Sequence, residues 1–398
     1  MKFVECKLSE LGEIVGGATP FTKNESYYGG DIPWLTPKDL ANFNGRYINF
    51  GERNITEAGY KSTSVKMLPI NSVLFSSRAP IGYVAINNKN EVCTNQGFKS
   101  VIPNSKTDYM FLYYLLKYNK NKIEAMGSGT TFKEVSGTVM KNIIVNVPET
   151  KEDQIKIGKI LSKIDDKIEL NTHTNDNLSE QLKQIFNNKF YDKIQNNDCS
   201  EFKEYILYDV LDVIDNRGKT PKLVEVSNYP IIDVRAISGE NRIIDYKQCQ
   251  KYVDDEVYNT FFRSGHPKIN DILISTVGSL AEMKIYMENK GTIAQNVVAL
   301  RSKYDYPMYI YQYLKAIKND LISYNIGSVQ PSIKVTQFMK HNIYIPKDKE
   351  LYEFENIAKL YTDKMFNISK ENETLEQLRD TLLPKLMNGE IDLDKIEI

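Results

Sequence analysis

Residues 157–189 read IGKILSKIDDKIELNTHTNDNLSEQLKQIFNNK, and residues 354–386 read FENIAKLYTDKMFNISKENETLEQLRDTLLPKL. In both stretches a set of mostly apolar positions, here called a seam, recurs at alternating steps of four and three residues. The first seam runs from Ile157 to Lys189 and the second, 197 residues later, from Phe354 to Leu386. A heptad spacing held over about four repeats predicts two coiled-coil helices. The alternative is that each helix only packs against its own domain.

Asparagine occupies the same position in both seams, at Asn175 and Asn372. A buried amide in an apolar seam specifies register at some cost in stability, so we expect these residues to fix the register of the helix pair. Pro384 lies near the end of the second stretch and should bend or end that helix, while Gly389 suits a stop just beyond it.

The remaining sequence is also duplicated. Residues 8–15, LSELGEIV, are echoed by residues 207–214, LYDVLDVI, and each run soon reaches a Thr-Pro pair, at Thr19 and at Thr220. Further echoes, in the same order, are NSVLFSS at 71–77 with NDILIST at 270–276, Asn95-Gln96 with Gln295-Asn296, Gly127-Ser128 with Gly327-Ser328, and Met140-Lys141 with Met339-Lys340. Five echoes in one order, spaced by about 200 residues, indicate an internal repeat.

Each half reads as mixed helix and strand. Short β-branched or apolar runs predict strands at 72–76, 143–147, 272–275 and 343–345. One helix per half is expected: Asp108 caps a helix over 109–126, and Pro307 opens a helix that stops at Gly327. The predicted fold is therefore α+β, with two similar mixed α/β domains separated by two long antiparallel coiled-coil helices in a pseudo-two-fold repeat. The expected boundaries are 1–149 and 201–346 for the domains, and 150–200 and 347–398 for the helices.

Composition limits the possible classes of protein. The 398 residues hold 51 Lys and Arg against 52 Asp and Glu, and this balance, taken whole, argues against a nucleic-acid binder. Four cysteines never form a C-x-x-C pair, which disfavours a zinc site and a disulfide framework. No apolar run approaches about 18 residues and the N-terminus lacks a secretory pattern, so a cytoplasmic location is expected.

The sequence lacks the motifs of common catalytic sites. The tripeptide GKT at 218–220 resembles the end of a phosphate-binding loop, but Val213 stands where that motif needs glycine. There is no Pro-Pro pair of the adenine methyltransferases, no G-x-S-x-G elbow and no H-E-x-x-H pair. The three histidines are scattered, at His173, His266 and His341. A chain without catalytic activity or bound metal is expected, although its many carboxylates leave a nuclease open.

The whole chain resembles the specificity subunit of Type I restriction-modification systems. Residues 382–391, LLPKLMNGEI, look like that family's Leu-Leu-x-Lys-Leu-x-x-Gly-Glu-Ile ending, and residues 327–331, GSVQP, are similar to its Gly-Ser-x-Gln-Pro turn. The first half departs from this turn, with GSGTT at 127–131, so a role of Gln330 is not transferred there.

The resemblance implies a non-catalytic subunit that recognises an asymmetric, bipartite DNA site. Two similar domains held apart by paired helices also suit a target of two half-sites. The partners implied are two methyltransferase subunits, docked on the helices, and restriction and translocase subunits. S-adenosylmethionine, ATP and Mg would bind those partners, and no cofactor would bind this chain. Two alternatives remain, a duplicated nuclease or hydrolase and a scaffold without a nucleic-acid role.

Direct readout of bases uses Arg or Lys for guanine and Asn or Gln for adenine. In the first domain the loop candidates are Lys23, Asn24, Lys38, Arg78, Asn95, Gln96 and Lys133. In the second they are Arg217, Lys219, Lys222, Arg235, Gln295, Asn296, Gln330 and Lys334. A solvated charge or a loop hydrogen bond is an equally good interpretation of any one of them, and phosphate contacts should outnumber base contacts.

Charge divides unevenly along the sequence. Residues 1–150 carry a net charge of +4 and residues 201–346 carry +1, whereas residues 151–200 carry −1 and residues 347–398 carry −5. The near-zero net charge of the whole chain therefore results from positive domains and negative helical segments that offset each other. We expect the isolated chain to bind DNA weakly and the assembled complex to bind it strongly.

Overall fold

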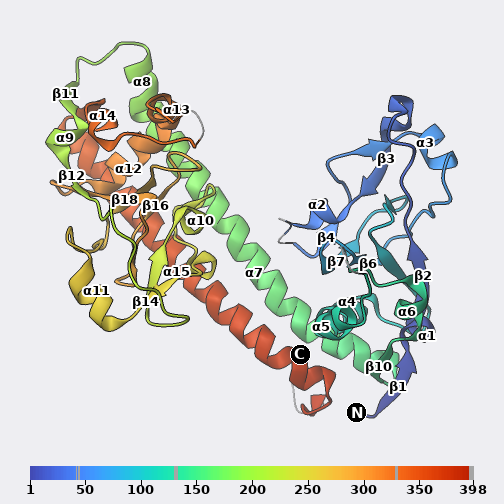
Figure 1. Cartoon of the computed structure of the whole chain (residues 1–398). Helices are drawn as coiled ribbons and strands as arrows, with labels where there is room; N and C mark the ends of the chain where they lie inside the picture. The colour runs from blue at the N-terminus through green and yellow to red at the C-terminus, as the bar shows by residue number, and fades with distance from the viewer. Residues whose placement is uncertain (42, 44, 130–132, 328–329, 394–398) are drawn as a thin grey trace. The chain divides into compact units, whose positions relative to one another are not determined.

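The structure is a computed structural model of the chain and describes residues 1–41, 43, 45–129, 133–327 and 330–393. It divides into two compact units, here called unit 1, Met1–Glu169 with Glu373–Ile398, and unit 2, Leu170–Asn372. Each unit holds one part of the helix α7 (Lys151–Phe186) and one part of the helix α15 (Asp348–Met387) (Figure 1). The long helices and the duplicated α+β halves are thus confirmed. Among the described residues, no helix has the length and apolar character that crossing a bilayer requires.

Unit 1 contains a five-stranded sheet in the order β2-β9-β6-β7-β4, a three-stranded sheet in the order β5-β3-β8, and the pair β1-β10. Its strands are β1 (Phe3–Lys7), β2 (Gly12–Gly16), β3 (Tyr28–Leu35), β4 (Tyr47–Ile48), β5 (Asn54–Ile55), β6 (Val73–Ser77), β7 (Ile81–Asn87), β8 (Cys93–Thr94), β9 (Lys99–Pro103) and β10 (Ile144–Pro148). Its short helices are α1 (Leu8–Leu11), η1 (Glu25–Tyr27), α2 (Pro37–Ala41), α3 (Glu57–Lys61), α4 (Tyr109–Tyr118), α5 (Lys120–Ala125) and α6 (Gly137–Asn142).

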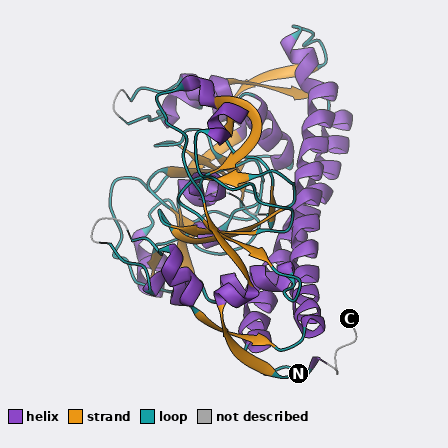
Figure 2. Ribbon diagram, turned by 90° about the vertical axis from the view of Figure 1, so that its right-hand side faces the viewer, coloured by secondary structure: helices purple, strands orange, loops and turns teal. Residues whose placement is uncertain are grey.

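Unit 2 repeats this plan with a four-stranded sheet in the order β12-β18-β15-β16, a three-stranded sheet in the order β14-β13-β17, and the pair β11-β19. Its strands are β11 (Phe202–Ile206), β12 (Leu211–Ile214), β13 (Tyr229–Ile232), β14 (Tyr252–Val253), β15 (Ile272–Ser275), β16 (Met283–Ile285), β17 (Thr292–Ile293), β18 (Val297–Ser302) and β19 (Asn342–Pro346). Its short helices are η2 (Asn187–Tyr191), α8 (Asp192–Gln195), α9 (Leu207–Val210), α10 (Val234–Ile237), η3 (Tyr246–Gln248), α11 (Asp255–Phe261), α12 (Pro307–Ala316), α13 (Lys318–Ser323) and α14 (Val335–Phe338). Loops make up much of both globular parts (Figure 2).

The expected helix of each half is interrupted in the structure. Asp108 caps α4 as predicted, with its carboxylate accepting the N–H of Phe111 at 2.8 Å, and Pro307 is in the first turn of α12. However, α4 gives way to α5 at Asn119, whose side-chain amide donates to the Leu115 carbonyl at 2.9 Å. A side chain that bonds the preceding turn in this way competes with regular helix hydrogen bonding. The second helix is interrupted at Ile317, and α13 ends at Ser323 rather than at Gly327.

The two long helices run antiparallel within each unit. In unit 2, Asn171 donates to the Asn372 side-chain oxygen at 2.8 Å, and the Asn175 amide lies 3.3 Å from the Met365 carbonyl oxygen. In unit 1, Arg379 of α15 donates to the Asp165 carboxylate of α7 at 2.8 Å. Asn175 and Asn372 therefore each face the opposite helix, and their role in fixing register stays a prediction.

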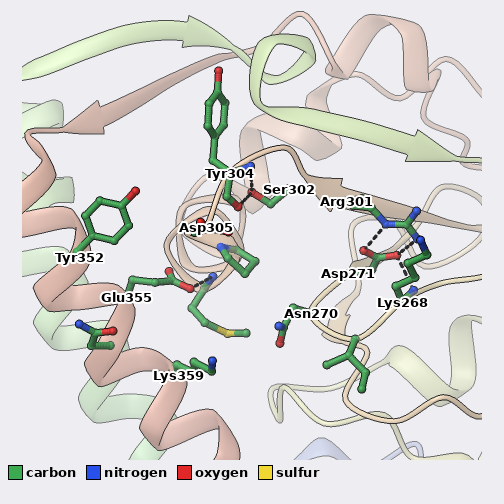
Figure 3. A pocket seen from close by; sticks show the side chains of 14 residues that line it. Lys268, Asn270, Asp271, Arg301, Ser302, Tyr304, Asp305, Tyr352, Glu355 and Lys359 are labelled. Atoms are coloured by element: carbon green, nitrogen blue, oxygen red, sulfur yellow. Dashed lines mark hydrogen bonds and ion pairs between the residues drawn. The ribbon is translucent and has the colours of Figure 1, made fainter.

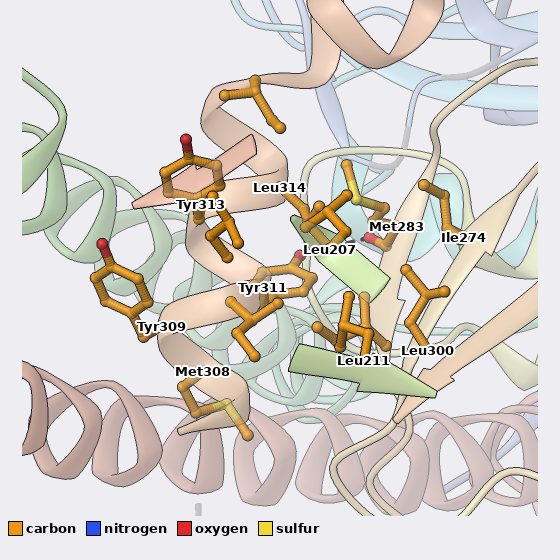
Figure 4. Close-up of a cluster of buried hydrophobic side chains, with 14 of the residues drawn as sticks. Leu207, Leu211, Ile274, Met283, Leu300, Met308, Tyr309, Tyr311, Tyr313 and Leu314 are labelled. Carbon is orange, nitrogen blue, oxygen red and sulfur yellow. Dashed lines mark hydrogen bonds between the residues drawn. The ribbon is translucent and has the colours of Figure 1, made fainter. Parts of the chain in front are cut away.

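Half of the seam side chains are buried, and all of the others except Lys189 are partly buried. Ile157 and Phe354 are fully buried, whereas Leu170 and Leu360, which lie off the seams, are 61% and 68% exposed. The seam residues also pack against the globular parts, because one core cluster of unit 2 joins Leu182, Phe354 and Met365 to strands and helices. Figure 4 shows other members of this cluster, among them Leu211, Leu300 and Tyr309. The helices thus pair with each other and pack against their domains at the same time.

One expectation at the helix ends was wrong, and the other is confirmed in part. Lys189 is exposed, because α7 continues as a π-helical turn, η2, and the wider turn rotates the buried face to Phe186 and Phe190. At the other end, α15 does not end at Pro384 but runs on to Met387. The predicted stop at Gly389 is confirmed, because this glycine follows the helix with a positive φ of 73°.

Candidate nucleic-acid interface

A threonine and a glutamine meet at the same place in both units. In unit 1 the Thr19 hydroxyl donates to the Gln96 side-chain oxygen. In unit 2 the Gln295 amide donates to the Thr220 hydroxyl at 3.2 Å. Both glutamines are exposed, in the turns that connect β8 to β9 and β17 to β18. Each unit therefore presents a glutamine whose orientation is fixed by a distant loop.

Cations and amides surround the Gln96 turn. Asn95 shapes the turn by accepting the Gly97 N–H at 2.8 Å, and the Lys99 ammonium lies 3.4 Å from the Gln96 carbonyl oxygen. Lys99 and Arg78 both approach Glu134, at 3.3 Å and 3.6 Å. The structure thus brings Arg78, Asn95 and Gln96 into one polar cluster.

The other candidates of the first domain have separate positions. Asn24 caps the helix η1 by accepting the Ser26 N–H at 3.2 Å, and Lys38 pairs with Glu52 at 2.6 Å. Lys23 and Lys133 are exposed on loops. Thr130 and Thr131 of the GSGTT stretch lie outside the described residues.

In unit 2 the Gln295 turn borders a pocket of about 270 Å³. Its lining combines polar side chains with apolar ones: Asn216, Lys219, Thr220, Pro221, Leu223, Ile231, Asp233, Lys251, Phe262, Ile293, Ala294, Gln295 and Asn296. Three candidates therefore converge here, Lys219, Gln295 and Asn296. The Asn296 side-chain oxygen is buried and accepts no hydrogen bond from the described residues, so this oxygen is not presented to solvent.

Two arginines near this pocket are already paired with carboxylates. Arg235 binds Asp233 at 2.7 Å and also donates to Gln250 at 2.7 Å. Arg217 donates to both carboxylate oxygens of Asp215. Burial alone would raise the pKa of Asp215, but the hydrogen bonds from Arg217 outweigh burial and the pKa is lowered. The pairing holds both guanidinium groups in defined orientations.

Of the remaining candidates of the second domain, Gln330 and Lys334 lie at residues 327–334, whereas Lys222 lies between Pro221 and Leu223 of the Gln295 pocket. The N–H of Gly278 donates to the Pro331 carbonyl at 3.0 Å, which places this turn beside the connection from β15 to β16. A side chain on Gly327 would collide with the Gln330 carbonyl, which explains the glycine. Gln330, Lys334 and Lys222 are exposed, whereas Ser328 and Val329 lie outside the described residues.

A second pocket of unit 2, of about 560 Å³, lies between the long helix α15 and the start of α12 (Figure 3). Asp271 pairs with Arg301 at 2.7 Å on one side of it, and Glu355 of α15 accepts the N–H groups of Met308 and Tyr309 on the other. Sequence reasoning missed this site. Within the described part of the chain, no cluster of three or more His, Cys, Asp or Glu side chains could hold a metal ion.

Sequence reasoning also missed the two threonines as partners of the glutamines. Their signal was the Thr-Pro pair repeated in both halves, but the pairing joins residues 77 and 75 positions apart. No local pattern reports such a contact.

Comparisons with known proteins agree with the repeated architecture. The family model of the Type I restriction modification DNA specificity domain matches residues 1–180 and again residues 199–382. The MjaIX specificity subunit of Methanocaldococcus jannaschii is 32% identical over 98% of this chain and 94% of that protein. The EcoR124I/EcoR124II specificity subunit of Escherichia coli is 29% identical over 40% of each chain.

The crystal structure of a Type I S subunit from M. genitalium has the same fold, with a TM-score of 0.58 over 97% of this chain and 96% of that chain, at 18% identity. None of these comparisons supports the nuclease or hydrolase alternative. With both halves matching one family model, the chain belongs to the specificity subunits of Type I restriction-modification systems, which are non-catalytic and recognise DNA together with the other subunits of the system.

Proposed function

We propose that the two recognition domains, residues 1–149 and 201–346, each read one half of an asymmetric bipartite DNA site. The helical segments 150–200 and 347–398 set the distance between the half-sites and dock two methyltransferase subunits. S-adenosylmethionine, ATP and Mg bind the partner subunits, so this chain supplies sequence choice and no chemistry.

The observation that carries this proposal is the Thr–Gln pair found in both units. A glutamine amide offers the donor and acceptor that match adenine in the major groove. Ordering an exposed side chain before binding lowers the entropy lost on binding, so a glutamine fixed by Thr19 or Thr220 suits base readout. Because the same Thr–Gln pair occurs in two domains of different sequence, it supports a common mode of base recognition in which each domain binds a different half-site.

Sequencing of methylated bases tests the proposal in cells that carry this gene and its partner genes, compared with cells that lack this gene. We expect adenine methylation at one bipartite motif that depends on the gene. Unchanged methylation at every bipartite motif would refute the proposal.

The two glutamines provide matched variants. Gln96→Ala should relax the choice of base at one position of one half-site and leave the other half-site intact, and Gln295→Ala should do the reverse. Loss of a base contact of this kind reduces discrimination by about 1–3 kcal/mol. Relaxation of both half-sites by either variant would show that these glutamines act on the fold rather than on bases.

A further inference from the structure

Two buried arginines occupy equivalent positions in the repeat. The carbonyl oxygen of Arg46 accepts the Ile86 N–H at 2.7 Å, and that of Arg242 accepts the Ile285 N–H at 2.9 Å. Both arginines directly precede a short parallel pairing at the edge of the main sheet of their unit. Their exposed fractions are only 4% and 2%, which is unusual for arginine.

In unit 1 the Arg46 side chain reaches from the sheet edge to the long helix α7. Its Nε and Nη2 atoms donate to the two carboxylate oxygens of Glu169 at 3.0 Å and 3.1 Å, and Nη2 also donates to Asp166. Its Nη1 atom donates to the Ser162 carbonyl at 3.4 Å. Burial lowers the pKa of Arg46, but the bonds to Glu169 and Asp166 outweigh burial and the pKa is raised.

In unit 2 the Arg242 side chain reaches the other long helix, α15, and its partners are neutral. Nη1 donates to the Thr362 hydroxyl at 2.8 Å, and Nη2 donates to the Gln312 side-chain oxygen at 2.9 Å. The guanidinium carbon lies 4.9 Å from the centre of the Tyr311 ring. Burial lowers the pKa of Arg242, and its Nε atom has no hydrogen-bond partner among the described residues.

Burying an arginine between a domain and a helix has an unfavourable free energy of desolvation. Desolvation of an ion costs several kcal/mol, and apolar residues of similar size often stabilise such a position better. Apolar contacts, however, are non-directional. The guanidinium donates in a rigid planar fork, so Arg46 and Arg242 restrict rotation of the helix surface as well as its distance.

We propose that Arg46 and Arg242 are positioning residues that fix the orientation of each recognition domain on its long helix, and thereby the spacing between half-sites that the complex accepts. This inference rests on the proposed function, because spacing has meaning only for a reader of a bipartite site. In this scheme Arg46 orients the first domain on α7, and Arg242 orients the second domain on α15.

The test uses the complex of the full chain with its methyltransferase subunits and a DNA library in which the spacer is one base pair shorter, native or one base pair longer. The readout is the ratio of methylation at altered spacers to methylation at the native spacer. A variant that only lowers stability reduces both rates and leaves their ratio unchanged. For Arg46→Met and Arg242→Met we expect the ratio to rise about tenfold, which equals ~1.4 kcal/mol of lost discrimination.

Conservative and control variants sharpen the result. Arg46→Lys should restore part of the discrimination, because an ammonium can still pair with Asp166 or Glu169, whereas Arg242→Lys should restore less. The exposed residues Arg53 and Arg263 supply the controls, and replacing either by Met should leave the ratio unchanged.

The ratio decides the inference even where a variant folds poorly. If Arg46→Met yields no folded complex, Glu169→Gln removes one charge from the more exposed partner of the same contact, whose side chain is 32% exposed. A smaller rise of the ratio is then expected. Unchanged spacer preference in the folded Arg46 or Glu169 variants, together with an unchanged preference in Arg242→Met, overturns the inference. Absence of methylation by the wild-type complex at every spacer refutes the proposed function instead.

Discussion

Replacement of Glu355 by glutamine should remove a pH dependence from the stability of unit 2. Glu355 is only 5% exposed, and its carboxylate accepts the N–H groups of Met308 at 3.1 Å and Tyr309 at 2.8 Å. Burial raises its pKa from 4.5 to about 7, although the two N–H groups and the charges of Lys359 and Arg242 all lower it.

The sign of the effect follows from proton binding. Because the folded state holds the proton more tightly than the unfolded state, the contribution to stability is complete below pH 4.5 and is lost as the pH rises through 7. At ~1.4 kcal/mol per pKa unit, the full loss is about 3 kcal/mol, of which 2 to 3 kcal/mol falls between pH 5 and pH 8.

Urea unfolding of the full chain at several pH values between 5 and 8 measures this loss. The free energy of unfolding of Glu355→Gln relative to wild type should increase by about 2 to 3 kcal/mol over that range, since glutamine does not titrate. Glu353→Gln is the control, because Glu353 lies on the same helix but is half exposed, 3.8 Å from Lys189. Parallel pH profiles of wild type and Glu355→Gln would show that Glu355 remains charged in the folded protein and that burial does not dominate.

Two other predictions concern the long helices. Asn175→Leu should raise the free energy of unfolding by about 1 kcal/mol, because the buried Asn175 side-chain oxygen has no hydrogen-bond partner among the described residues. The two helices should then pair with less specific register. A lower free energy of unfolding in urea would contradict this prediction. Deletion of one heptad from each seam, residues 164–170 and 361–367, should change the preferred length of the DNA spacer and leave both half-site sequences unchanged. Sequencing of methylated bases measures both properties. A changed half-site sequence would show that the helices also read DNA.

The long helices and the duplication were predictable because their signals are local or periodic. The burial of Ile157 and Phe354 and the exposure of Leu170 and Leu360 follow directly from heptad position. The failure at Lys189 has a local cause of another kind, since one π-helical turn changes which face is buried, and no heptad count detects it.

The candidate site was less predictable because its contacts join distant residues. Gln96 was selected by residue type, but its partner Thr19 lies 77 residues away, and Arg46 meets Glu169 across 123 residues. The residue that caps α12 is also distant in sequence from the helix that it caps. Asp108 caps the equivalent helix of unit 1 from its own N-terminus, with Gly158 of α7 beside it. In unit 2 the cap comes instead from Glu355 of the long helix, and the sequence around Pro307 does not reveal it.

The pairing of cations within the domains bears on how this chain can bind DNA. Arg217, Arg235 and Lys38 are each held by a carboxylate. The net charges of +4 in residues 1–150 and +1 in residues 201–346 already count these carboxylates, so only a small positive charge is left to attract phosphates. The pairing instead favours orientation, because a guanidinium fixed by Asp233 or Asp215 presents its remaining donors in one direction. We therefore expect the domains to contribute more to the choice of bases than to the attraction of DNA, and the partner subunits to supply most of the phosphate neutralisation.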